Sequence, residues 1–370
     1  MNTTSSTIPK MSPEKLISNM TLAYSTVINN KSPLSTIPAL MLWGPPGVGK
    51  SQAIHKIAHN LHESTGKTTR VTDVRLMLFN PIDLRGIPTS NHDKTLAIWL
   101  KPQIFHMDES EDVINILFLD EISSAPQSVQ AAAYQITLDR TIGEHKLPDN
   151  CIVVAAGNRT SDKSVASKMP RALANRLMHI EIETSFDSWR RWAIANGIHE
   201  KVIGFLSFRR GYLMDINADE NDLAFATPRT WEMVSNILNG VSDDINTIYQ
   251  FVSALVGTGI SFEFRNWCSI YEELPDIEEI FAGKEAYIPE NTDVICAMIC
   301  AMTAYASKHR DNMEKIANSI KYMQALPAEF FTLLMRDYMS IEPGYKHKLR
   351  VIPEFDEWIS SKEGLFDEFE

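Results

Sequence analysis

The chain has 370 residues, of which 44% are hydrophobic and 22% are charged, and its formal net charge is -12 at pH 7. This length and hydrophobic fraction suit two or three folded domains and exclude a wholly disordered chain. The acidic balance argues against a general nucleic-acid-binding protein, because such proteins need a basic footprint, although a local basic patch is still compatible with it.

No targeting or membrane segment is evident. The first ten residues are polar and lack the apolar stretch of an export signal. The most apolar stretch, residues 294–304, is too short to cross a bilayer. The four cysteines are too few and too scattered for a disulfide scaffold, so buried reduced thiols are favoured over a metal pair. We therefore expect a cytoplasmic protein.

The first strong pattern is an apolar run, a glycine-rich loop and a helix. A capped helix is expected from Ser12 to about Asn29, and Ala39–Trp43 then has the character of a buried strand. The following loop has the phosphate-binding spacing of glycine, four residues, then glycine, lysine and serine. The residues expected to contact a nucleotide are Gly44, Pro45, Pro46, Gly47, Val48, Gly49, Lys50, Ser51 and Gln52.

Each residue type in this loop has an expected role in binding phosphate. Glycines allow successive backbone N–H groups to point at an anion, and the start of the next helix adds its dipole. Lys50 is expected to reach the β- and γ-phosphates of ATP, and the Ser51 hydroxyl to bind Mg2+. The alternative is a chance glycine-rich turn between a strand and a helix.

Two carboxylates follow the next clear strand. Arg70–Leu78 is a strand candidate, residues 83–105 make an excursion from the core, and Val113–Leu119 suits a central parallel strand. Asp120 and Glu121 come directly after it, where open α/β sheets place ligand sites. We expect Asp120 to support Mg2+ and Glu121 to orient and deprotonate the attacking water. An acidic strand-end turn is the alternative.

A polar amide follows another buried strand. Pro126–Thr137 is expected to be a helix, Thr141–Pro148 a hairpin and Cys151–Ala156 a strand that ends at Gly157 and Asn158. The Asn158 side chain is placed to hydrogen-bond the attacking water or the γ-phosphate. Asparagine after a strand is also a common turn residue.

Arginines mark the next segments. Ser164–Leu177 has helical character, with Arg171 and Arg176 toward its end, and His179–Ile182 is the fifth expected strand. These cations can be partners of the helix dipole. The sharper hypothesis makes Arg176, or else Arg171, an arginine finger that acts on the γ-phosphate of a neighbouring subunit.

From about residue 183 the pattern is helical. In a helical lid over residues 185–265, Thr227 is a helix cap, Pro228 occupies the first helical position, and Arg229 lies in the first turn. Arg229 is either a lid cation that approaches the phosphates or an ordinary surface arginine. Residues 266–370 are expected to form further helices with an acidic tail.

Taken together, these motifs resemble the AAA+ ATPases and, within them, the MoxR-like branch. The resemblance covers about residues 36–265 and includes Walker A, Walker B, sensor 1, arginine-finger and sensor 2 motifs in the order of the family. They are Gly44–Ser51, Ile116–Glu121, Ala155–Asn158, Ala172–Arg176 and Thr227–Arg229. One departure is Ser123-Ser124, where MoxR-like proteins usually carry asparagine and arginine.

The resemblance implies an architecture. We expect a five-stranded parallel α/β P-loop core over residues 36–184, after an N-terminal tail and helix over residues 1–35. Residues 83–105 look like the helix-2 insert of this branch, and residues 138–150 like its pre-sensor hairpin. The lid and the helical extension complete the chain.

The resemblance also implies a function. It indicates Mg2+-dependent ATP hydrolysis in a ring, as a hexamer, with ATP bound between subunits. The expected output is remodelling or maturation of a protein client, with a von Willebrand factor A domain protein as partner. A nucleic-acid-directed motor in restriction or phage defence, and a nucleotide-gated scaffold with little turnover, are the alternatives.

Overall fold

A computed structural model of the protein describes residues 8–159, 169, 174–183, 185–215 and 222–362. The chain divides into two compact units, Met1–Thr184 and Ser185–Glu370. Each unit has its own hydrophobic core.

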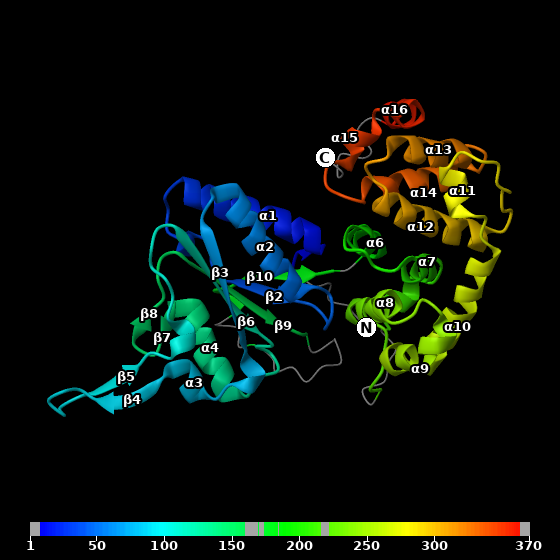
Figure 1. The fold of residues 1–370 in the computed structure, drawn as a ribbon. Coiled ribbons are helices and arrows are strands. Elements are labelled where there is room, and N and C mark those ends of the chain that lie inside the picture. The colour runs from blue at the N-terminus through cyan, green and yellow to red at the C-terminus, as the bar shows by residue number, and fades with distance from the viewer. Residues whose placement is uncertain (1–7, 160–168, 170–173, 184, 216–221, 363–370) are drawn as a thin grey trace, which may run out of the picture. The chain divides into compact units, whose positions relative to one another are not determined.

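The first unit is built on a six-stranded parallel sheet with the order β1-β10-β2-β9-β6-β3 (Figure 1). Its strands are β1 (Lys10–Met11), β2 (Leu40–Trp43), β3 (Thr68–Arg75), β6 (Val113–Asp120), β9 (Cys151–Gly157) and β10 (Met178–Ile182). All seven residues of β9 are buried, and so are the first seven of β6. Continuous apolar runs therefore form strands that are covered on both faces, as parallel sheets require.

The sixth strand, β1, corrects the expectation of a five-stranded sheet. β1 pairs in parallel with Glu181 and Ile182, and the Glu181 N–H donates a hydrogen bond to the Pro9 carbonyl at 3.0 Å. The Lys10 ammonium lies 3.0 Å from the Glu183 carboxylate. A strand of two residues is too short to show the alternation of side chains on which sequence prediction depends.

Helices cover both faces of the sheet. Figure 1 shows α1 (Pro13–Asn29) and α2 (Lys50–Thr65) on one face, and α3 (Pro81–Arg85) and α4 (Gln127–Asp139) toward the other. The apolar side of α4 shares a core with the inward residues of the strands, among them Val129, Leu117 and Val153. This arrangement confirms the expected α/β P-loop fold.

Two small hairpins lie beside this core. They are formed by β4 (Ile87–Ser90) with β5 (Ala97–Leu100), and by β7 (Thr141–Ile142) with β8 (His145–Lys146). The hairpins touch, because the His145 ring nitrogen Nε2 lies 2.8 Å from the Trp99 carbonyl oxygen. A Cβ atom at Gly143, whose φ is +57°, would come within 2.7 Å of the Arg85 carbonyl oxygen, so only glycine fits this contact.

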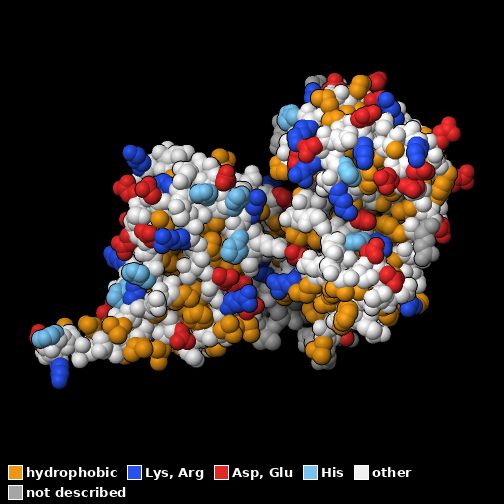
Figure 2. All heavy atoms as spheres, viewed as in Figure 1, with side chains coloured by type: hydrophobic (Ala, Val, Ile, Leu, Met, Phe, Trp, Pro, Cys, Tyr) orange, Lys and Arg blue, Asp and Glu red, His pale blue; other side chains and the backbone are white. Residues whose placement is uncertain are grey.

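The β4–β5 hairpin projects from the unit and exposes apolar side chains. Ile87 is 61% exposed and its cross-strand partner Leu100 is 55% exposed. Figure 2 shows hydrophobic side chains gathered along this projection. These residues lie in the segment that the sequence marks as an excursion from the core.

The second unit is helical. Its helices are α6 (Phe186–Ala195), α7 (Glu200–Phe208), α8 (Pro228–Gly240), α9 (Ile245–Val256), α10 (Thr258–Cys268), α11 (Ile277–Phe281), α12 (Thr292–Lys308), α13 (Met313–Met323), α14 (Ala328–Met339), α15 (Tyr345–Leu349) and α16 (Pro353–Ser360). In the described parts of the chain, short 3-10 helices lie at Leu34–Thr36, Leu76–Leu78, Gln103–Phe105, Arg210–Leu213 and Ser269–Glu273. One hydrophobic core runs from Trp189 to Ile359, so the ranges predicted as lid and extension share their interior.

The apolar helix α12 lies in the middle of this core. Its residues are buried on several faces rather than along one stripe, which is the pattern of a central helix. Among the described residues, no helix combines the length and the apolar character needed to cross a membrane.

All four cysteines are free thiols, as predicted. Cys151, Cys268 and Cys300 are buried, and Cys296 is partly buried. Burial raises the pKa of Cys151 to about 11 and the pKa values of Cys268 and Cys300 to about 12, so these thiols are protonated at neutral pH. In the described ranges, no group of three or more His, Cys, Asp or Glu side chains is arranged to hold a metal ion.

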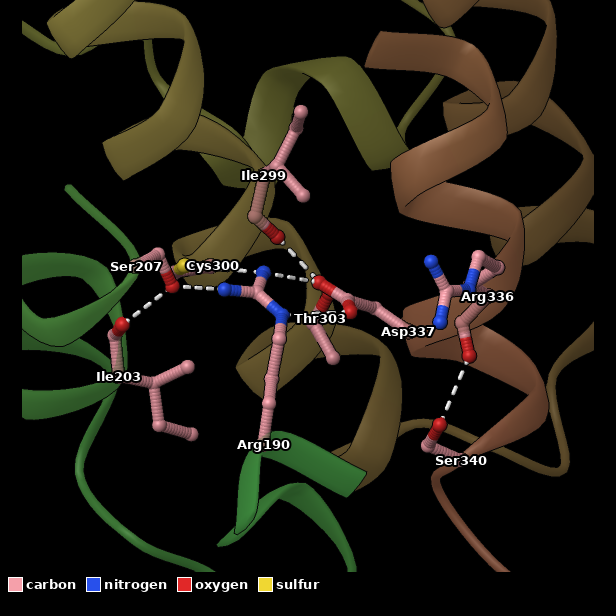
Figure 3. A network of polar contacts seen from close by, with 9 residues as sticks. All are labelled: Arg190, Ile203, Ser207, Ile299, Cys300, Thr303, Arg336, Asp337 and Ser340. Atoms are coloured by element: carbon pink, nitrogen blue, oxygen red, sulfur yellow. Dashed lines mark hydrogen bonds and ion pairs between the residues drawn. The ribbon is translucent and has the colours of Figure 1, made fainter. Parts of the chain in front are cut away.

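A buried ion pair joins two helices of the second unit (Figure 3). The Arg190 guanidinium on α6 donates to both carboxylate oxygens of Asp337 on α14, with Nε–Oδ1 at 2.8 Å and Nη2–Oδ2 at 2.5 Å. The remaining nitrogen, Nη1, donates to the Ser207 hydroxyl. Arg190 is only 6% exposed and Asp337 only 3%, so neither charge has water as an alternative partner.

We predict that Asp337→Asn destabilises the second unit by about 3–5 kcal/mol, because it leaves the buried Arg190 charge uncompensated. Denaturant unfolding followed by tryptophan fluorescence measures this loss. Five of the seven tryptophans report on the second unit: Trp189, Trp192, Trp231, Trp267 and Trp358.

The matched control is Asp356→Asn, which breaks the exposed pair of Arg350 and Asp356, whose side chains are 50% and 49% exposed. We expect this change to cost less than about 1 kcal/mol. If the two variants lost the same free energy of unfolding, the buried pair would not be important for stability.

Candidate nucleotide-binding site

The phosphate-binding loop connects β2 to α2. Gly47 and Gly49 have φ values of +81° and +90°, which glycine adopts without steric cost. Gly49 is also the N-cap of α2, so the loop ends at free backbone N–H groups of a sixteen-residue helix. Of the other predicted contact residues, Val48 is buried, whereas Pro46 and Gln52 are exposed.

Lys50 is the first residue of α2, and its side chain lies along the loop. It is 9% exposed, and its ammonium donates to the carbonyl oxygens of Gly44 at 2.5 Å and Pro45 at 3.0 Å. The third contact is with the Asn158 side-chain oxygen Oδ1, at 3.0 Å. The structure therefore brings together the loop lysine and the amide that follows β9.

Ser51 and Asp120 also meet. The Ser51 hydroxyl donates to Asp120 Oδ2 at 3.2 Å, and Asp120 Oδ1 accepts the N–H of Glu121 at 2.8 Å. A hydroxyl and a carboxylate are hard oxygen donors, which suit Mg2+, and two protein ligands leave positions for phosphate oxygens and water. The residues present thus fit the implied metal ion.

A second acid lies on the neighbouring strand. Asp73 on β3 lies two residues before Arg75, which is opposite Asp120 in the register of β3 and β6. The pKa of Asp73 is raised by partial burial and then by the negative charge of Asp120, whereas the Arg75 cation lowers it. Asp73 and Asp120 are therefore close enough to influence each other.

Glu121 has a left-handed backbone, with φ at +58°. This conformation costs a non-glycine residue about 1–3 kcal/mol, and it persists only where neighbouring contacts impose it. Here the Ile122 N–H donates to the Ala156 carbonyl at 2.9 Å, and the Ser124 N–H donates to the Glu121 carbonyl at 3.0 Å. Strained backbone conformations of this kind cluster at functional sites. The conformation of Glu121 therefore agrees with a functional role for its carboxylate.

Sequence reasoning missed the contact of Ser123. Its hydroxyl accepts the backbone N–H of Asn158 at 2.9 Å, which ties the turn after β6 to the end of β9. A Cβ atom at Gly157 would lie 2.9 Å from this hydroxyl oxygen. No local pattern in the sequence indicates this contact, because Ser123 and Asn158 are thirty-five positions apart.

A second link runs from β2 to the segment before Arg176. The Trp43 indole N–H donates to His179 Nδ1 at 2.9 Å, and the two rings are stacked with centroids 6.0 Å apart. The other imidazole nitrogen, Nε2, lies 2.7 Å from the Ala174 carbonyl oxygen.

Of the three predicted arginines, Arg176 and Arg229 lie in the described part of the chain. Arg176 is exposed, in the turn before β10. Arg171 and most of the helix expected over Ser164–Leu177 lie outside the described residues. Arg229 is exposed in the first turn of α8, after the Thr227 cap, and it belongs to the second unit.

Comparison with known families matches one segment of the chain. Residues 40–185 match the family described as "ATPase family associated with various cellular activities (AAA)". The match covers less than half of the chain, and the loop, acids and amide described above lie within it. No curated protein matches the sequence.

Solved structures give weaker similarities. PCH-2 from C. elegans is 16% identical, with a TM-score of 0.36 over 70% of this chain and 69% of that chain. A mutant of RuvB from Thermotoga maritima is 16% identical, with a TM-score of 0.35 over 70% and 71%. A putative ATPase from Cytophaga hutchinsonii is 15% identical, with a TM-score of 0.31 over 87% and 88%. Similarities at this level transfer no function to the chain.

Proposed function

We propose that the chain hydrolyses ATP in a Mg2+-dependent reaction at the site around Lys50. The observation that carries this proposal is the pair of side-chain contacts across one sheet edge, Lys50 with Asn158 and Ser51 with Asp120. A cation, an amide, a hydroxyl and a carboxylate are thus placed beside a loop whose N–H groups suit a phosphate.

The roles follow from the chemistry of these groups. Lys50 would stabilise negative charge on the β- and γ-phosphates, and Ser51 and Asp120 would hold Mg2+. When bound, Mg2+ neutralises phosphate charge that develops during transfer. Glu121 would take the proton of the attacking water, and the Asn158 amide would orient that water or the γ-phosphate.

Assembly and output complete the proposal. The exposed guanidinium of Arg176 suits an arginine finger that acts on a neighbouring subunit, which requires an oligomer, and we propose a hexameric ring. Arg229 would act as the lid cation that approaches the phosphates. The exposed apolar β4–β5 hairpin would contact a protein client during remodelling or maturation, with a von Willebrand factor A domain protein as partner.

Lys50→Ala should weaken ATP binding by more than about tenfold, because a charge-assisted contact with phosphate is lost. A fluorescent nucleotide titration measures the Kd. The control is Lys56→Ala, which removes an exposed lysine from the same helix and should leave the Kd unchanged. Full ATP affinity in Lys50→Ala would refute the assignment of the loop.

Glu121→Gln should retain ATP binding and slow hydrolysis by about 10²-fold or more, because the amide cannot accept the proton of water. Phosphate release and nucleotide affinity are measured on the same preparation. The exposed Glu63→Gln on α2 is the control and should turn over like the wild type. Unchanged hydrolysis in Glu121→Gln would place the general base elsewhere.

Arg176→Ala should stop turnover while ATP binding stays intact, because a finger acts on the nucleotide of its neighbour. Subunits with Lys50→Ala lack a working loop but retain Arg176. A mixture of the two variants should therefore recover part of the ATPase activity. A mixed assembly that stays inactive, although each variant still assembles, would contradict action between subunits.

A further inference from the structure

We propose that Ser123 is a positioning residue that holds the backbone of Asn158, so that the Asn158 amide stays aligned with Lys50 during ATP hydrolysis. This inference rests on the proposed function and assigns a role to the position where the sequence departs from the MoxR-like pattern.

The first support is a continuous chain of hydrogen bonds. The Ser123 hydroxyl accepts the backbone N–H of Asn158 at 2.9 Å, and the Asn158 side-chain oxygen accepts the Lys50 ammonium at 3.0 Å. Asn158 is thus held at its backbone by one residue and at its side chain by another. Ser123 is 2% exposed, so water does not compete for its hydroxyl.

The second support is the tight fit around this contact. A Cβ atom at Gly157 would approach the Ser123 oxygen to 2.9 Å and the Met41 Cε atom to 3.0 Å. The glycine therefore allows the Ser123 turn to come close to β9. A small hydroxyl residue fills this space, and the asparagine of the MoxR-like pattern has a larger side chain.

The third support is that the turn carrying Ser123 is itself anchored. The Gln130 side-chain amide, which is 4% exposed, donates to the Ala125 carbonyl at 2.8 Å and to the Ser123 carbonyl at 3.3 Å. The Ile122 N–H donates to the Ala156 carbonyl at 2.9 Å. Glu121 belongs to the same turn. One anchored segment therefore fixes the positions of both the proposed base, Glu121, and Asn158.

This geometry predicts an effect on catalysis rather than on affinity. Lys50 also bonds to Gly44 and Pro45, so the loop keeps its shape without Asn158. Asn158 has no equivalent second anchor for its backbone N–H among the described residues. Loss of the Ser123 hydroxyl should therefore misalign the amide and leave ATP binding largely intact.

The test compares Ser123→Ala, Asn158→Ala and the double variant in the full chain. We expect Ser123→Ala to lower kcat about tenfold, the scale of one misplaced hydrogen bond, with the KM for ATP within about twofold of the wild type. In the Asn158→Ala background, Ser123→Ala should cause little further loss, because it acts through that residue. The exposed Ser128→Ala on α4 is the control.

The outcomes separate this inference from the proposed function. A wild-type protein without ATPase activity would refute the function itself. An active wild type with an unchanged kcat in Ser123→Ala, or with the same fold loss in both backgrounds, would overturn the role of Ser123.

A second variant covers the case in which Ser123→Ala fails to fold, which a melting curve would show. Ser123→Cys keeps a side chain of similar size but replaces the oxygen by a weak acceptor. It should melt like the wild type and have a reduced kcat. Wild-type kcat in this variant would overturn the proposal.

Discussion

The site depends on one constraint, the parallel order β2–β9–β6 and the register within it. Trp43 lies opposite Gly157, and Leu119 lies opposite Ala155. The three strands therefore finish at nearly the same level, and the residues that follow them emerge side by side at the carboxyl edge. A slip of one residue in any pair would turn the side chains of that strand to the opposite face and separate the loop from the acids.

Each unit contains charged side chains that are held by several hydrogen bonds. In the sheet unit, the Lys50 ammonium donates to oxygens of Gly44, Pro45 and Asn158, and both carboxylate oxygens of Asp120 accept hydrogen bonds. In the helical unit, Arg190 and Asp337 satisfy each other in a bidentate contact. Such complete pairing stabilises a single arrangement, because any alternative leaves a buried group without a partner.

Much of the sheet unit could be predicted because its signals are local. Continuous apolar runs mark β2, β6 and β9, and the chemistry-bearing residues follow each run directly. Three features left no such signal. β1 has only two residues, the left-handed turn at Glu121 is imposed by contacts with β9, and the Ser123 hydroxyl acts on a residue thirty-five positions away. The shared core of the helical unit was equally hidden, since periodicity shows which face is buried but not against which helix.

The stacked pair of Trp43 and His179 has a further consequence. An indole nitrogen can only donate, so the imidazole must present a lone pair to it and carry its proton on the side of Ala174. The tautomer with its proton on Nε2 thus connects the strand entering the phosphate loop with the turn leading to Arg176.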